Sequence, residues 1–273
     1  MADTVIRPQS LIFTLFGDYV HHRGDRIWVG SLIRLLALFG VSDQAVRSTL
    51  SRMVRRGWLR TERAGKASYY ALTLPAQRMI VEGAERIFHA PSTDRPWTGG
   101  WQLVTYSIPE EQREARDAFR GELISLGYGM LANAVWLSPY DSRQRLESLA
   151  GSLGIRCNVQ LFNGRFEGFS PCRELAARCW ELETINARYA AFIAKYAPLM
   201  HECEQRGMPG DDQCFLRRFM LIHEYRRFPF RDPHLPEDLL PAGWRGAEAA
   251  ALFQKYHALL AAGANRYFES VFR

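Results

Sequence analysis

The sequence lacks long apolar runs and the compositional bias of a disordered chain. Its longest apolar stretches fall far short of the roughly 20 residues that span a bilayer. The first ten residues, MADTVIRPQS, have no apolar core of the signal-peptide kind. We therefore expect a cytoplasmic protein with no membrane partner. With 47% hydrophobic and 23% charged residues, the composition excludes a disordered chain and a coiled coil. The length of 273 residues favours two or three domains.

Cysteine is also scarce, and its spacing matches no common zinc-site pattern. The five cysteines include no CxxC pair: Cys157, Cys172, Cys179, Cys203 and Cys214. We expect them to be reduced and to serve mainly in packing. His201, Glu202 and Cys203 are consecutive and cannot all face one metal on a helix. The sequence therefore predicts neither a bound metal nor a resident cofactor.

Positive charge is concentrated in the first third of the chain. Residues 1–90 hold 13 Lys and Arg against seven Asp and Glu, whereas the remainder holds 22 of each. The whole net charge of +6 thus lies in the first 90 residues. Such asymmetry is typical of a domain that faces a polyanion, although six extra positive charges can also arise by chance.

Three helices are predicted before residue 58. The first follows Pro8 and ends before Gly24, and the second covers Val29–Phe39 and ends at Gly40. Their inward residues recur at helical spacing: Leu11, Ile12, Leu15, Phe16 and Tyr19 in the first, and Leu32, Ile33, Leu35, Leu36 and Phe39 in the second.

The third helix, in SDQAVRSTLSRMVRRGWL, has the pattern of a recognition helix. Ser42 is a natural N-cap, Asp43 suits the positive end of the helix dipole, and Gly57 ends the helix. One face is apolar: Val46, Leu50, Met53 and Val54. The opposite face carries small polar residues and arginines, with Arg47 and Arg56 on its flanks. The predicted DNA-binding residues of this helix are Gln44, Arg47, Ser48, Ser51, Arg52 and Arg55. Small side chains let the backbone approach a groove, while arginines reach phosphates or guanine edges.

A hairpin with a basic turn follows the third helix. Two strand-like runs, 58–62 and 67–72, flank a turn that contains Gly65 and adds Arg63 and Lys66 to the predicted DNA-binding residues. Three helices and such a hairpin have the order of a winged helix. Between positions 42 and 66 the chain carries seven basic residues against two acidic ones. The pattern also fits a winged helix that makes only protein contacts, with its arginines on a solvated face.

The middle of the chain predicts a ferredoxin-like domain. Prolines and glycines near residues 88–99 indicate a linker. A strand in WQLVTYSIP, a helix over 110–126, two short strands within 128–137, a helix over 141–153 and a strand over 156–162 then give the order β-α-β-β-α-β.

This middle segment resembles the small CRISPR spacer-acquisition endonuclease, whose first strand ends in Tyr-Asp-Ile. A metal-dependent nuclease is therefore the alternative function. In this sequence Ser107 stands between Tyr106 and Ile108 at the position of the Asp. A serine hydroxyl is a poor ligand for Mg²⁺ compared with a carboxylate, so we expect the fold without the nuclease chemistry.

The last hundred residues are predicted to be mainly helical. Apolar and aromatic stripes at helical spacing run over 185–196, 215–225 and 252–260, and the proline-rich stretch 228–244 is predicted to be an ordered loop. Arg226, Arg227 and Arg231 could hold an acidic, aromatic ligand, or they could pair with Glu224 and Asp232. The sequence leaves both possibilities open, and the ligand-binding residues are unknown at this point.

The whole chain resembles the PaaX family. The matching segments are VSDQAVRSTLSRMVRRGWL, WQLVTYSIPEEQREARDAFRGELISLGYG and RDPHLPEDLLPAGWRG. The resemblance implies an α+β, multidomain chain: a winged helix in 1–90, a ferredoxin-like domain in 97–172, and a helical sensing and dimerisation domain in 173–273.

The resemblance also implies a function. A homodimeric repressor would bind double-stranded operator DNA of a phenylacetate-type catabolic operon and would not be an enzyme. The implied effector is an acyl-CoA, namely phenylacetyl-CoA or a related aryl-CoA. Similarity to winged helices of the GntR type ranks Arg47 first for base contact, with phosphate contacts from Arg55, Arg63 and Lys66.

Overall fold

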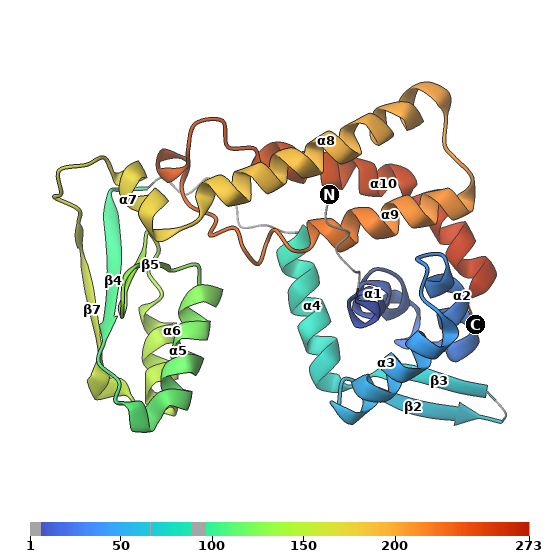
Figure 1. The fold of residues 1–273 in the computed structure, drawn as a ribbon, viewed down its shortest axis with the longest axis horizontal. Coiled ribbons are helices and arrows are strands. Elements are labelled where there is room, and N and C mark those ends of the chain that lie inside the picture. The colour runs from blue at the N-terminus through green and yellow to red at the C-terminus, as the bar shows by residue number, and fades with distance from the viewer. Residues whose placement is uncertain (1–6, 66, 89–96, 273) are drawn as a thin grey trace. The chain divides into compact units, whose positions relative to one another are not determined.

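The computed structural model describes residues 7–65, 67–88 and 97–272, which form two compact units (Figure 1). The first unit comprises the described residues of Met1–Ala90, Ala191–Arg227 and Glu248–Arg273. The second comprises those of Pro91–Ala190 and Phe228–Ala247. The division into three domains stays a prediction, with the bounds 1–90, 97–172 and 173–273. The two compact units divide the last of these stretches between them. Most of the predicted linker, residues 89–96, lies outside the described residues.

The N-terminal part of the first unit is a winged helix. Its elements are α1 (Pro8–Leu15), β1 (Arg26–Trp28), α2 (Val29–Ala37), α3 (Asp43–Arg55), β2 (Leu59–Ala64), β3 (Ala67–Leu72) and α4 (Leu74–Phe88). The helical path of α1 continues through a π turn and a 3-10 turn to Gly24, whose φ of +86° favours glycine. The predicted helix between Pro8 and Gly24 is therefore confirmed.

Two elements of the winged helix were not anticipated from the sequence. Strand β1 pairs with β3 and gives a three-stranded antiparallel sheet in the order β1-β3-β2. Helix α4 follows the hairpin directly. The second helix ends at Ala37 rather than Phe39, and its inward residue Ile33 is only half-buried.

The C-terminal helices complete the core of the first unit. They are the second half of α8 (Leu182–Arg206), α9 (Asp211–Tyr225) and α10 (Gly246–Val271). The ring of Tyr19 lies 5.1 Å from that of Phe215 on α9 and 4.9 Å from that of Phe268 on α10, and all three side chains are fully buried. Helix α9 packs on α1 (Figure 1). The winged helix and the C-terminal helices therefore share one hydrophobic core.

The second unit contains the predicted ferredoxin-like fold. Its elements are β4 (Gly100–Tyr106), α5 (Arg113–Ser125), β5 (Gly129–Ala132), β6 (Val135–Ser138), α6 (Arg143–Ser152), β7 (Val159–Arg165) and α7 (Cys172–Cys179). The antiparallel sheet has the order β5-β6-β4-β7, with the first strand between the third and the fourth. The last strand begins at Val159, three residues later than predicted, because residues 156–158 form a 3-10 turn.

The two faces of this sheet have different cover. Val104 and Trp136 pack with Phe119 of α5 and Leu146 of α6. On the opposite face, Trp101 and Leu137 pack with α7 and with the stretch around Leu239. This stretch, 228–244, contains a single 3-10 turn and no α-helix, which confirms the predicted ordered loop.

The structure also bears on the cysteines and on the lengths of the helices. All five cysteines are free; Cys203 and Cys214 are buried and serve in packing, but Cys157 is exposed and does not. Within the described ranges, every helix is too short or too polar to cross a bilayer.

Candidate DNA-binding surface

Helix α3 presents a polar face above a buried apolar one. Ser42 caps its first turn, because the serine hydroxyl accepts a hydrogen bond from the Ala45 amide at 3.3 Å, as predicted. Val46, Leu50 and Met53 are fully buried, while Val54 is half-buried. This burial fixes the rotation of the helix about its own axis.

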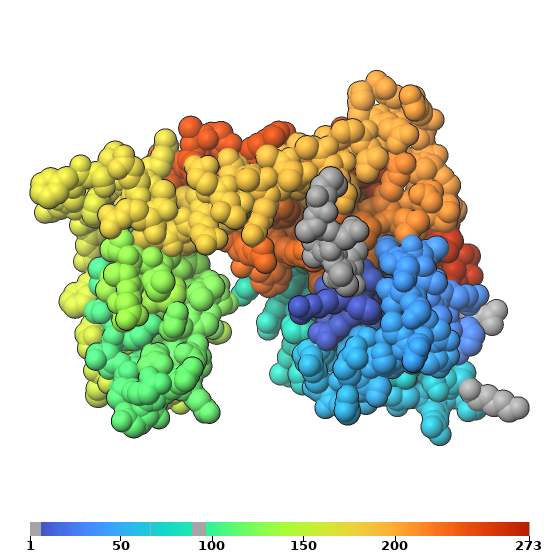
Figure 2. Space-filling view, in the orientation of Figure 1, coloured from blue at the N-terminus to red at the C-terminus, as the bar shows by residue number. Residues whose placement is uncertain are grey.

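All six predicted DNA-binding residues of α3 lie on its exposed side. Each has an exposed side chain: Gln44, Arg47, Ser48, Ser51, Arg52 and Arg55. In the space-filling view the surface of α3 and the hairpin, in shades of blue, is open at the lower edge of the first unit (Figure 2). The structure therefore brings these residues together on one accessible helix face.

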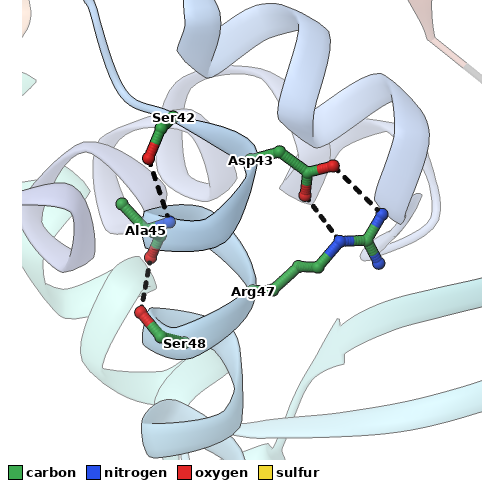
Figure 3. A network of polar contacts seen from close by, with 5 residues as sticks. All are labelled: Ser42, Asp43, Ala45, Arg47 and Ser48. Carbon is green, nitrogen blue, oxygen red and sulfur yellow. Dashed lines mark hydrogen bonds and ion pairs between the residues drawn. The ribbon is translucent and has the colours of Figure 1, made fainter.

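Arg47 is held by an acidic residue one turn earlier. Its Nε donates to Asp43 Oδ1 at 2.5 Å and its Nη2 to Asp43 Oδ2 at 3.4 Å (Figure 3). Both side chains are more than half exposed, and exposed pairs of this kind contribute only about 0.2–1 kcal/mol. A base edge can therefore replace Asp43 at little cost. The Nη1 hydrogens of Arg47 point to no partner among the described residues.

The neighbouring polar side chains differ in the hydrogen bonds that they make within the protein. Ser48 Oγ donates to the Ala45 carbonyl at 3.1 Å (Figure 3), which leaves its lone pairs free to accept. Arg52 Nη2 donates to Thr49 Oγ1 at 2.9 Å. Thr49 itself is buried, a position that the amphipathic pattern did not predict. Arg55 forms no hydrogen bond or ion pair with any residue described in the structure, which suits a contact to phosphate.

In the hairpin of β2 and β3, which is the wing of the winged helix, one of the basic side chains is paired with an acidic residue and is less free to contact DNA. Glu62 pairs with Arg60 at 2.5 Å and lies 3.6 Å from Arg26. Arg63 is exposed and has no polar partner within the described ranges. Lys66 lies outside the described residues. The position of Arg26 beside the hairpin could not be predicted from the sequence. Strand β1, which places it there, has only three residues and no strand pattern of its own.

Ser107 stands where the nuclease has its carboxylate, and its backbone is held in place by hydrogen bonds. Ser107 follows β4, and its backbone amide and carbonyl are both bonded to Asn158, at 2.9 and 2.7 Å. No group of three metal-ligating side chains occurs in the described part of the chain. The carboxylate of Asp141 lies beside Gln102, near the other end of β4. It accepts from the Arg143 amide and from Gln102, and these bonds lower its pKa.

Among the described residues, the three arginines near the end of α9 form no ion pair with Glu224 or Asp232, which was one of the two alternatives left open by the sequence. Glu224 pairs with Lys195 at 2.6 Å, and Asp232 accepts from the Tyr189 hydroxyl at 2.8 Å. Arg226 instead donates to Ser10 of α1. Arg227 and Arg231 are exposed.

Comparisons with known proteins cover nearly the whole chain. Residues 7–75 match the family described as PaaX-like protein, residues 94–176 the PaaX protein central Cas2-like domain, and residues 180–270 the PaaX-like protein C-terminal domain. The chain is 35% identical over 250 residues to the transcriptional repressor PaaX of Escherichia coli, covering 89% of this chain and 77% of the relative.

A solved structure adds a similarity of fold. An uncharacterized protein from Mycobacterium tuberculosis superposes with a TM-score of 0.59 at 21% identity, covering 95% of this chain and 97% of the other. At that identity the comparison concerns the fold alone.

Proposed function

The chain belongs to the PaaX family, and we propose that it is a sequence-specific DNA-binding repressor of a phenylacetate-type aromatic-acid catabolic operon. The observation that carries the proposal is the exposed face of α3, where three arginines and three small or amide side chains lie opposite a buried apolar face. A helix of this kind enters the major groove, and its side chains contact phosphates and base edges.

We propose that two copies act on one operator. Two recognition helices would enter successive major grooves of a quasi-palindromic site, roughly one helical turn apart, while the wings contact the flanking backbone. We propose that Arg47 contacts bases and that Arg55, Arg63 and Lys66 contact phosphates. The homodimer itself is part of this proposal.

The proposed effector is phenylacetyl-CoA or a related aryl-CoA thioester. It would release the operator by binding preferentially to a conformation in which the two winged helices do not match the half-site spacing. We propose no catalytic role for the chain, because Ser107 replaces the carboxylate that a metal-dependent nuclease requires. A repressor acts on chromosomal DNA, and we therefore propose the cytoplasm as its location.

A gel-shift titration on the protein's own promoter tests the proposal. The wild type is expected to shift this fragment in preference to shuffled DNA at roughly 0.1–0.2 M salt. Arg55→Ala is expected to weaken binding, whereas the matched control Arg120→Ala, an exposed arginine on α5 of the second unit, is expected to bind like the wild type. Equal loss in both variants would show that the contact depends on net charge and not on α3.

The effector is tested on the same complex. Release by phenylacetyl-CoA is expected, and release by free phenylacetate without any response to the thioester would contradict this assignment. DNA cleavage that requires Mg²⁺ or Mn²⁺ and stops in EDTA would contradict the absence of catalysis.

A further inference from the structure

A stripe of polar residues runs along one side of the first helix. Ser10, Thr14 and Asp18 are four residues apart and therefore share a face of α1 and of the π turn that follows it. Thr14 and Asp18 are buried, and Ser10 is half-buried. This stripe faces α9 and α10 instead of solvent.

Ser10 and Thr14 belong to one continuous hydrogen-bond network. Arg226 Nη2 donates to Ser10 Oγ at 2.6 Å and to the Ser10 carbonyl at 3.1 Å. Thr14 Oγ1 donates its single hydrogen to the same carbonyl at 3.1 Å. The same hydroxyl lies 2.8 Å from His223 Nδ1, so the imidazole is hydrogen-bonded to Thr14 as well.

Asp18 is the centre of a second buried contact. Its carboxylate lies 2.9 Å from Arg218 Nη1 on α9 and 3.1 Å from His257 Nε2 on α10. Arg218 also lies over the ring of Tyr19, 5.0 Å from its centroid. Both networks therefore connect the winged helix to the C-terminal helices.

Polar contacts of this kind fix the register between helices. Apolar side chains can slide past one another and still be buried, but a buried charge that loses its partner is strongly destabilising. Burial, together with the charge of Arg227, lowers the pKa of Arg226 to about 10, so the side chain is still a cation at neutral pH. Movement of α1 along α9 would leave this cation without its acceptors.

Arg226 occupies a particular place along the chain. It is the C-cap of α9, and the second chain segment of the other unit begins two residues later, at Phe228. The side chain that holds α1 therefore projects from the last turn before the chain leaves the first unit. Helix α1 in turn packs on α3, the predicted recognition helix.

We propose that Arg226 is a positioning residue, which couples the end of α9 to the winged helix through its hydrogen bonds to Ser10. A shift of the last turn of α9 would then be passed to α1 and, through the packing of α1 on α3, to the recognition helix. The regulatory part of this inference rests on the proposed function, namely operator binding that an aryl-CoA effector releases. The attachment of α1 to α9 does not depend on it.

Hydrogen–deuterium exchange tests the attachment without DNA or effector. In Arg226→Gln, the amides of Leu11–Leu15 are expected to exchange at least tenfold faster than in the wild type, while those of β4 and β6 do not change. Ser10→Ala is a milder variant that removes only the hydroxyl acceptor, and a smaller increase is expected. Arg227→Gln, an exposed neighbour, is the matched control. Unchanged protection of α1 in Arg226→Gln would overturn the proposal.

Gel shifts on the protein's own promoter test the coupling. Arg226→Gln is expected to bind the operator within about threefold of the wild type. The concentration of phenylacetyl-CoA that gives half-release is expected to rise at least tenfold, with partial recovery in Arg226→Lys. A purely structural role would change operator binding and release together, and release at the wild-type concentration would overturn the coupling. If the wild type fails to bind the operator or to respond to phenylacetyl-CoA, the proposed function is wrong, and the exchange comparison alone then decides the role of Arg226.

Discussion

At the scale of single residues, the proposed DNA contacts depend on which arginine side chains already have a polar partner within the protein, and not on positive charge alone. The basic residues of α3 and the hairpin look equivalent in the sequence, but the structure separates them. Arg47 is held by Asp43 and Arg60 by Glu62, whereas Arg55 and Arg63 have no polar partner among the residues that the structure describes. A guanidinium held by a carboxylate on its own helix has a defined direction, as base readout requires, while a free one can follow a phosphate. The sequence could predict which face of α3 carries cations, but not these pairings.

Substitution of Arg47 is expected to relax base preference. Arg47→Ala should reduce discrimination against mismatched sites by about 1–3 kcal/mol at the contacted base pair. Arg55→Ala and Lys66→Ala should weaken binding to all sequences similarly and reduce the salt slope by about one unit. Binding curves on matched and mismatched sites over a salt series measure both quantities. If the variants behave alike, the division into base and phosphate contacts is wrong.

The buried imidazole of His223 is expected to make the fold sensitive to acid. Burial, with smaller effects from Arg226 and Arg227, lowers its pKa to about 3, whereas the unfolded chain has a value near 6.5. Between these two pKa values the imidazole is protonated in the unfolded state and neutral in the folded state. The free energy of unfolding therefore falls as the pH drops from about 6.5 towards 3, by about 2 kcal/mol at pH 5, and this group has no effect above 6.5.

Urea unfolding at pH 7 and pH 5 measures this contribution. His223→Gln should lose less stability on acidification than the wild type, whatever its stability at pH 7. His22→Gln, which changes an exposed histidine, serves as the control. The same pH dependence in the wild type and in His223→Gln would contradict the prediction.

At the scale of elements, periodicity predicted most of the fold. The three N-terminal helices, the hairpin and the β-α-β-β-α-β order follow from patterns that each segment carries by itself. Strand β1 could not be predicted, because its three residues pair with β3, more than 40 positions later. The last strand of the sheet was predicted to begin three residues early, because residues 156–158 form a 3-10 turn in which no residue is buried.

The N-cap of α3 is expected to contribute to stability and not to DNA contact. Ser42→Ala should lower the free energy of unfolding by about 1 kcal/mol, because it removes the acceptor for the Ala45 amide. Ser51→Ala, in the middle of the exposed face, should leave stability within about 0.5 kcal/mol and weaken operator binding. Thermal melts and gel shifts on both variants provide the comparison. An equal loss of stability in the two variants would argue against the capping role.

At the scale of the whole molecule, the winged helix is part of a larger unit. Family patterns suggest a separate N-terminal domain, but Tyr19 and Phe39 of the winged helix pack against Phe215, Phe219 and Phe268. The sequence pattern could identify Tyr19, Phe39, Phe215 and Phe219 as inward-facing but did not include Phe268, and it could not show which helices share a core. The C-terminal helices therefore contact the recognition helix through one intermediate element, because α9 packs on α1 and α1 packs on α3.

A fragment of residues 1–90 is expected to be poorly folded. Without α9 and α10, the buried faces of Tyr19 and Phe39 are open to water, and Asp18 loses both partners. Dispersion of amide signals in NMR and binding of a hydrophobic dye should report a loose, aggregation-prone fragment. A monomeric fragment with a cooperative melt would show that the shared core is dispensable.

Sequence-specific binding to the protein's own promoter is the most direct test of the account. Affinity for the promoter fragment and for a shuffled fragment of equal length should be measured by fluorescence anisotropy at about 0.15 M salt. A dimeric repressor predicts a preference of roughly 10³-fold or more for the promoter, lost in large part in Arg47→Ala. Equal affinity for the two fragments would contradict the claim that α3 reads DNA sequence.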